Sequence, residues 1–108
     1  MPYSYGYFKT EVAKYIIKHV PSGTKILDVG AGSGTYGMML NAFYPIDALE
    51  IFDKYVEQFK LHEIYQNVHV GDIRKFIFKD YDFLIFGDVW EHLSVADAKS
   101  VSYTHLRA

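Results

Sequence analysis

The sequence predicts an α/β fold built on a parallel β-sheet. Short apolar segments of strand character alternate with helical patterns along the chain, which is the order expected of βαβ units. A glycine-rich turn follows the first predicted strand directly. The length of 108 residues indicates one compact domain, and an apolar content of 50% excludes a disordered chain.

The individual elements are predicted in order from the N-terminus. Apolar residues from Phe8 to Val20 recur at helical spacing before Pro21, which predicts an N-terminal helix within residues 1–21. Apolar runs predict four strands, at residues 24–29, 46–51, 68–70 and 81–86. Further helices are predicted at residues 35–43, after a cap formed by Asp53, and at residues 94–101.

Acidic residues stand at or near the end of every predicted strand: Asp28, Glu50, Asp72 and Asp88. Any one of them could be a turn or cap residue, because surface loops favour aspartate. The carboxyl ends of parallel strands, however, meet at one edge of the sheet, and ligands of such folds bind there. Four carboxylates on that edge would make a negative crevice, which favours a positively charged ligand and opposes a phosphate-rich one.

The turn after the first strand carries three glycines at alternate positions: Gly30, Gly32 and Gly34. Glycine permits positive φ and lets a ligand approach the backbone closely, so we expect this turn to bind a ligand. Residues 32–37 also spell the dinucleotide fingerprint G-x-G-x-x-G, and Glu50 lies 20 residues beyond Gly30, which leaves an NAD-dependent oxidoreductase as the first alternative. Asp28 opposes that alternative, because it would repel a pyrophosphate at the helix N-terminus.

The composition excludes several classes of protein. The chain has no cysteine, which excludes disulfide scaffolds, zinc sites ligated by cysteine and thiol catalysis. A net charge of -2 provides no broad basic surface, so we expect no nucleic-acid partner for this portion. No apolar run approaches the roughly 20 residues of a membrane span, and the first residues lack the character of a signal peptide. We therefore expect no membrane partner and a cytoplasmic location.

Four segments, in the same order, resemble motifs of one enzyme family. Residues 26–34 closely resemble the first motif of class I S-adenosylmethionine-dependent methyltransferases, and residues 48–52 resemble their second strand. Residues 70–73 are similar to their adenine-contacting turn, and residues 81–93 to the D-V-x-E-H-L version of their fourth strand. The resemblance implies a Rossmann-like, three-layer αβα fold, of which this chain would hold a partial sheet of four strands in the order 3-2-1-4.

The resemblance also implies how S-adenosylmethionine would lie along the first two strands. Asp28 would face the ammonium group, directly or through water. Glu50 would accept hydrogen bonds from both ribose hydroxyls, while Ile51 and Phe52 would pack on the adenine face. The residues of the glycine loop that would underlie the methionine and ribose parts are Gly30, Ala31, Gly32 and Gly34. A sulfonium and an ammonium suit the negative crevice expected from the strand ends.

The remaining roles fall on the third and fourth strands. The resemblance implies that Asp72 receives the adenine amino group and that the backbone N–H of Ile73 serves a ring nitrogen. Asp88 and Val89 would line the crevice beside the methionine moiety and the transferable methyl group.

Methyl transfer from a sulfonium is a one-step displacement, so the protein mainly aligns the reacting atoms. A general base matters only where the acceptor loses a proton, and Glu91 and His92 are the candidate residues. Asp88, Glu91 and His92 also resemble the metal motif of small-RNA 2'-O-methyltransferases. That motif begins with glutamate and has its histidine further downstream, so we expect no metal site.

A complete class I methyltransferase has seven strands, so the resemblance implies that residues 22–101 form the cofactor-binding half-domain of a longer enzyme whose methyl acceptor is unidentified. Residues 102–108 break the helical pattern, and we expect this tail not to be native sequence. A fourth strand unpaired on one side predicts self-association through its edge. A non-catalytic nucleotide-binding domain is the second alternative.

Overall fold

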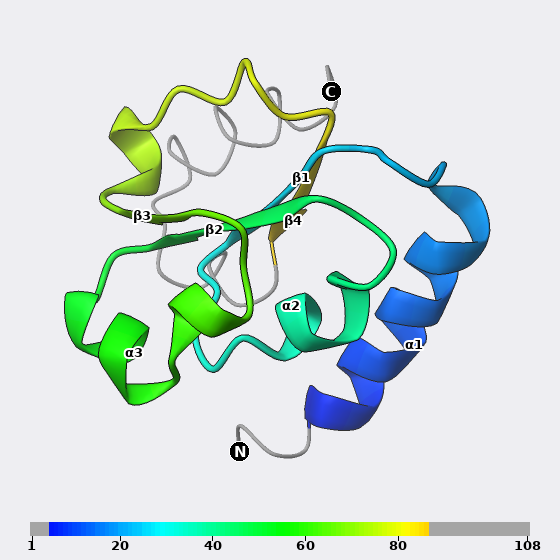
Figure 1. Cartoon of the computed structure of the whole chain (residues 1–108), viewed down its shortest axis with the longest axis horizontal. Coiled ribbons are helices and arrows are strands. Elements are labelled where there is room, and N and C mark those ends of the chain that lie inside the picture. Colours follow the sequence, from blue (N-terminus) through cyan, green and yellow to red (C-terminus); the bar gives the residue numbers. More distant parts are fainter. Residues whose placement is uncertain (1–4, 87–108) are drawn as a thin grey trace.

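The computed structural model describes residues 5–86 and contains one four-stranded parallel sheet (Figure 1). The strands follow the order β3-β2-β1-β4, which confirms the predicted order. Each strand is short, as expected of small α/β units, and the bounds are β1 Ile26–Val29, β2 Ile46–Glu50, β3 Val68–Val70 and β4 Phe83–Phe86.

The register of the strands aligns their carboxyl ends at one edge of the sheet. Val29, the last residue of β1, pairs with Leu49 of β2 and Phe86 of β4, and Glu50 at the end of β2 pairs with Val70 at the end of β3. All residues of β1 and β2 are buried, which explains their almost continuous apolar sequences. Residues that follow the strands therefore gather along one edge.

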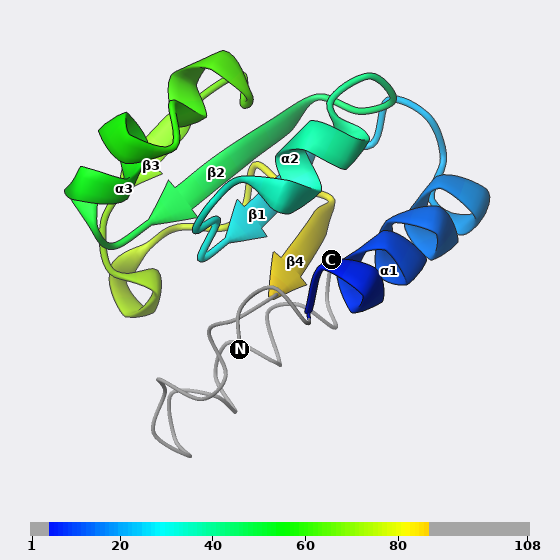
Figure 2. The ribbon, with the colours of Figure 1, turned by 90° about the horizontal axis from the view of Figure 1, so that it is seen from below.

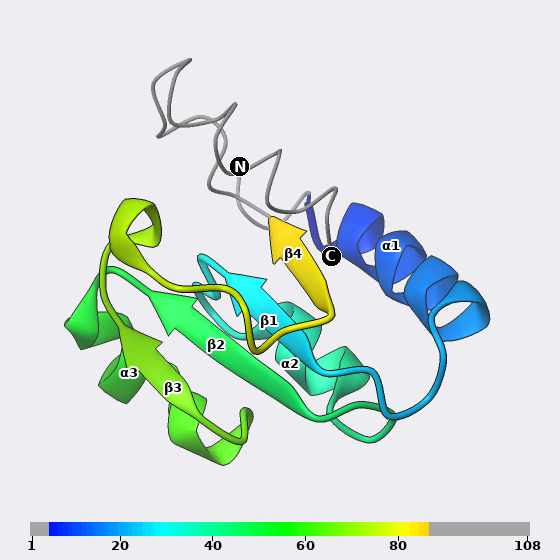
Figure 3. The ribbon, with the colours of Figure 1, turned by 90° about the horizontal axis from the view of Figure 1, so that it is seen from above.

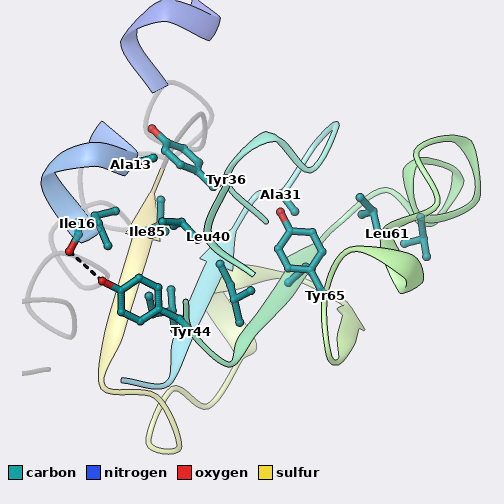
Figure 4. Packing of buried hydrophobic residues seen from close by; sticks show 13 residues of the cluster. Ala13, Ile16, Ala31, Tyr36, Leu40, Tyr44, Leu61, Tyr65 and Ile85 are labelled. Atoms are coloured by element: carbon teal, nitrogen blue, oxygen red, sulfur yellow. Dashed lines mark hydrogen bonds between the residues drawn. The ribbon is translucent and has the colours of Figure 1, made fainter. Parts of the chain in front are cut away.

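Three helices cover one face of the sheet: α1 Tyr5–His19, α2 Thr35–Leu40 and α3 Asp53–Gln58 (Figures 2 and 3). Side chains from these helices, from the alternate positions of the strands and from the 3-10 helix η2, Leu61–Glu63, form the larger buried cluster (Figure 4). Ala13 and Ile16 of α1 belong to this cluster, so the N-terminal helix shares the core of the sheet.

Several boundaries differ from the predicted ones. β1 begins at Ile26, because the N–H of Thr24 still bonds to Pro21 within the preceding turn. The predicted cap at Asp53 is wrong. Phe52 is the extended residue before α3, its N–H is bound by the Glu50 side chain, and Asp53 is already the first helical residue. α2 ends at Leu40, three residues before the predicted end, and continues as a turn.

The opposite face of the sheet is covered by the connection between β3 and β4. This connection includes the 3-10 helix η3, Ile73–Lys75, and lies above the sheet in Figure 1, on the side away from α2 and α3. Its side chains pack on a second buried cluster that contains Leu27, Leu49 and Leu84. Among residues 5–86, α-helices thus cover one face, and an irregular segment forms the layer on the other.

Within the same residues, none of the helices combines the length and apolar character that crossing a membrane requires. The predicted helix at residues 94–101 and the tail at residues 102–108 lie outside the described residues.

Candidate functional site

The glycine loop between β1 and α2 needs glycine for its backbone conformation. Gly30, Gly32 and Gly34 have φ angles of 72°, 56° and 82°, in the left-handed region where other residues are strained. Gly34 is also closely packed, since a Cβ atom there would lie 2.8 Å from Cδ1 of Ile64. The alternation of glycines in the sequence therefore reflects a tightly coiled turn at the carboxyl end of β1.

Glu50 ties this loop to the end of β2. The carboxylate is 3% exposed, its Oε1 accepts a hydrogen bond from the N–H of Gly32 at 2.8 Å, and its Oε2 accepts one from the N–H of Phe52 at 3.1 Å. Each carboxylate oxygen has capacity for a further hydrogen bond. Glu50 thus organises the loop and the start of α3 at once.

Asp28 is the third residue of β1, near the same edge of the sheet, and its side chain lies on the face covered by the helices. It is 1% exposed, and its Oδ2 accepts a hydrogen bond from the hydroxyl of Tyr65 at 2.5 Å. The Tyr65 oxygen in turn accepts a hydrogen bond from the N–H of Gly37 in α2 at 3.2 Å. Burial, followed by the charge and hydrogen bond of Asp28, raises the pKa of Tyr65 far above its ordinary value, so the hydroxyl remains a donor.

Asp72 follows β3 and is more exposed than Asp28 and Glu50. Its carboxylate binds the side chain of Arg74, with 2.6 Å between Nη2 and Oδ2 and 3.0 Å between Nε and Oδ1, and it also accepts the N–H of Arg74. Hydrogen bonds from the Arg74 side chain and backbone lower the pKa of Asp72 to about 2. Asp72 is therefore ionised and engaged by a neighbour two residues away, and Ile73 opens η3 beside it.

An apolar surface adjoins Glu50. Ile51 and Phe52 follow β2 directly and are 55% and 58% exposed. The ring of Phe52 meets Tyr55 edge-on, at 5.4 Å between centroids, and Tyr55 meets Phe59 at 5.5 Å. Exposed aromatic and branched side chains next to a buried carboxylate place an apolar surface beside a hydrogen-bonding group.

The structure brings three of the four predicted carboxylates to the carboxyl ends of neighbouring strands. Asp28, Glu50 and Asp72 stand near the ends of β1, β2 and β3, and the N–H of Gly71 bonds to the carbonyl oxygen of Glu50 at 3.1 Å. Asp88, Val89, Glu91 and His92 lie outside the described residues. Residues 5–86 contain no group of three histidine, aspartate or glutamate side chains placed to hold a metal ion.

Tyr65 was not predicted from the sequence. It belongs to no motif and lies in the segment between η2 and β3, 37 residues beyond Asp28. Only its buried position between η2 and α2 brings it to the carboxylate. A tyrosine in a connecting segment of an aromatic-rich chain carries no local signal of such a contact.

Comparison with family models and with curated protein sequences found no match. Solved structures do share the fold. Magnesium protoporphyrin IX methyltransferase from Synechocystis PCC 6803, with bound S-adenosylmethionine, is 20% identical, with a TM-score of 0.76 over 94% of this chain and 52% of that one. A TehB-like S-adenosylmethionine-dependent methyltransferase from Corynebacterium glutamicum is 24% identical, with a TM-score of 0.65 over 79% of this chain and 48% of that one.

A third similar structure is an amino pentose methyltransferase from Micromonospora echinaspora with bound S-adenosylmethionine. It is 23% identical, with a TM-score of 0.61 over 86% of this chain and 41% of that one. This chain thus spans about half the length of these structures. At these identities the likeness concerns the fold, and it confirms the Rossmann-like α/β architecture.

Proposed function

We propose that the chain is the cofactor-binding portion of an S-adenosylmethionine-dependent methyltransferase. The observation that carries the proposal is the pair of buried carboxylates, Asp28 and Glu50, on either side of a glycine loop at the carboxyl edge of a parallel sheet. Three methyltransferases of the same fold, two of them with S-adenosylmethionine bound, support it. The acceptor of the methyl group is not identified.

The charge of the site favours this cofactor over a dinucleotide. S-adenosylmethionine carries a sulfonium and an ammonium, and both are stabilised by nearby carboxylates. A pyrophosphate on the glycine loop would instead lie close to the buried Asp28, with an electrostatic cost that increases in a poorly solvated site. The G-x-G-x-x-G spacing therefore serves a tight turn here and need not serve a phosphate.

In this proposal the ribose and adenine lie at the end of β2. Glu50 accepts hydrogen bonds from the two ribose hydroxyls in addition to those of Gly32 and Phe52. Ile51 and Phe52 supply the exposed apolar face on which the adenine ring packs. Asp72 shares its carboxylate between Arg74 and the adenine amino group, and the N–H of Ile73 serves a ring nitrogen.

The methionine end lies over the glycine loop. Asp28 faces the ammonium group, and the backbone of the loop approaches the ligand without side-chain obstruction at Gly30 and Gly32. Asp88 and Val89, outside the described residues, complete this end in the proposal. The cofactor supplies an activated methyl group for a direct displacement, so these residues act by orientation. Glu91 or His92 takes a proton where the acceptor must lose one.

Calorimetric titration tests the proposal. S-adenosylhomocysteine should bind the chain, and NAD should not. Glu50→Ala should weaken S-adenosylhomocysteine binding by about 2–4 kcal/mol, because the two hydrogen bonds that the ribose hydroxyls donate to the charged carboxylate are lost. Glu57→Ala, which removes an exposed carboxylate in α3, is the control for the loss of one negative charge near the site. Tight binding of NAD without S-adenosylhomocysteine would favour the oxidoreductase instead.

Self-association is the other part of the proposal. β4 stands at the end of the strand order among residues 5–86, and edge strands readily pair with other chains. Light scattering coupled to size-exclusion chromatography should show a molar mass that rises with protein concentration. A constant monomer mass at high concentration would contradict self-association, and it would not affect the proposal on the cofactor.

A further inference from the structure

Tyr65 connects three parts of the candidate site. Its hydroxyl donates to Oδ2 of Asp28 at 2.5 Å and accepts from the N–H of Gly37 at 3.2 Å. The side chain is 4% exposed and comes from the segment before β3, a third element besides β1 and α2. Figure 4 shows its hydroxyl directed toward Ala31 of the glycine loop. One tyrosine therefore hydrogen-bonds to a buried carboxylate and to the first turn of α2, and it lies beside the loop that joins them.

The ring of Tyr65 lies close against the backbone of Gly37 in α2 and within ordinary contact distance of the position that a Cβ atom on Gly34 would take. A Cβ atom on Gly37 would lie 2.5 Å from Cε1 of Tyr65, and a Cβ atom on Gly34 would lie 3.7 Å from Cε2. The glycine at position 37 thus leaves room for the aromatic ring that reaches Asp28. The ring has little freedom to move without displacing α2, because close-packed interiors transmit such shifts.

We infer that Tyr65 is a positioning residue, which holds the Asp28 carboxylate in the orientation that receives the ammonium group of the cofactor. This inference rests on the proposed function. A carboxylate on a flexible side chain would have to be ordered at the moment of binding, at an entropic cost. The hydrogen bond from Tyr65 orders it beforehand and also satisfies part of its buried charge.

The inference predicts an effect confined to one end of the cofactor. Tyr65→Phe keeps the ring and removes only the hydroxyl, so Asp28 loses a donor and the N–H of Gly37 loses an acceptor. Ligands that carry the ammonium group should bind more weakly, and ligands that lack it should bind as before. Two probes separate these cases: S-adenosylhomocysteine has the amino-acid end, and 5'-methylthioadenosine lacks it.

Tyr44→Phe is the matched control. Tyr44 is 5% exposed, belongs to the same buried cluster, and donates to the carbonyl oxygens of Ile16 and Val20 at 3.0 and 2.8 Å. Figure 4 shows it beside α1. Its substitution removes the same atom from a second tyrosine of this cluster, so it reports the general effect of deleting a hydrogen-bonded tyrosine hydroxyl away from the glycine loop.

The experiment is calorimetric titration of the 108-residue chain and its variants with both probes. We expect Tyr65→Phe to weaken S-adenosylhomocysteine about 10-fold and to change 5'-methylthioadenosine less than about twofold, whereas Tyr44→Phe changes neither. In a double-mutant cycle, Asp28→Asn combined with Tyr65→Phe should lose no more S-adenosylhomocysteine affinity than Asp28→Asn alone, because Tyr65 acts through Asp28.

Three results would overturn the inference. Equal losses for the two probes would show a merely structural role, and unchanged S-adenosylhomocysteine binding would show no role at all; in both cases the proposed function stands. Failure of the unaltered chain to bind either probe would overturn the proposed function together with the inference.

If Tyr65→Phe does not fold, NMR of the unaltered chain gives the test. The carbon that bears the Tyr65 hydroxyl is isotope-labelled, and its resonance must shift with S-adenosylhomocysteine and not with 5'-methylthioadenosine.

Discussion

Two buried aspartate–tyrosine pairs lie on opposite faces of the same sheet. On the helix-covered face, Asp28 accepts the Tyr65 hydroxyl at 2.5 Å, and on the other face Asp47 accepts the Tyr81 hydroxyl at 2.7 Å. Both carboxylates are almost fully buried, and both tyrosines reach them from outside the strand. By residue type and burial the two pairs are nearly the same, and in each a tyrosine hydroxyl donates to the carboxylate.

Their surroundings differ. Asp47 is the second residue of β2, away from the carboxyl edge, and its Oδ1 also accepts both the backbone and the side-chain N–H of Asn67. The Tyr81 hydroxyl further bonds Nε2 of His69 at 3.0 Å. Asp28 adjoins the glycine loop. A buried acid with a tyrosine partner therefore does not by itself indicate a ligand site, and the proposed role of Asp28 depends on its position beside the glycine loop.

The largest effect on stability is expected from removal of Asp47, the acid of the pair that lies away from the glycine loop. Asp47→Ala leaves three donors, from Asn67 and Tyr81, without their buried acceptor, which should lower the free energy of unfolding by about 3 kcal/mol. Urea denaturation measures this loss. In the folded fraction, affinity for S-adenosylhomocysteine should be unchanged, in contrast to Asp28→Ala. Similar affinity losses in both variants would erase the distinction between the pairs.

A smaller effect is expected from a methyl group placed against Tyr65. Gly37→Ala puts a Cβ atom 2.5 Å from Cε1 of Tyr65 and 2.6 Å from Cγ2 of Ile64, so the ring must shift, and overpacking of this kind costs about 2 kcal/mol. Thermal unfolding should show the loss. Gly71→Ala is the control, since its Cβ atom would meet nothing within 4 Å. Unaltered stability and S-adenosylhomocysteine binding in Gly37→Ala would contradict the tight packing of Tyr65.

The smallest effect is expected from alkaline pH. Burial, together with the neighbouring carboxylates, raises the pKa of Tyr65 and of Tyr81 above the ordinary value of 10.0. Both hydroxyls stay protonated in the folded chain, whereas the unfolded chain releases these protons above pH 10. Stability is therefore intact below pH 10 and should begin to decrease as the pH rises above it.

Tyrosinate absorbance during an alkaline titration measures this behaviour. Exposed tyrosines should ionise first, and Tyr65 and Tyr81 only as the chain unfolds. Tyr65→Phe and Tyr81→Phe should each remove one late-ionising group and make the pH dependence less steep. Ionisation of all tyrosines in a single step before unfolding would contradict the buried pairs on both faces.

Much of the sheet was predictable from local patterns. The apolar runs of β1 and β2 and the glycines between β1 and α2 predicted the strands and the turn, because burial on both faces and positive φ each restrict residue choice strongly. The position of Asp28, Glu50 and Asp72 at one edge was predictable for another reason, because a parallel sheet aligns the carboxyl ends of its strands. The start of α3 was predicted wrongly at Asp53. The residue before the helix is Phe52, whose N–H donates to the Glu50 side chain, and this contact leaves no signal in the local sequence.

Local sequence patterns predicted the strands, the alternate glycines and the acids that follow β1, β2 and β3, since each depends on residues close together in the chain. The pairing of each buried acid with its tyrosine depends instead on contacts between elements that are distant in the chain. Tyr65 reaches Asp28 across 37 residues and Tyr81 reaches Asp47 across 34, through packing of connecting segments on opposite faces. Such long-range contacts depend on how whole elements pack, and a linear pattern does not record that.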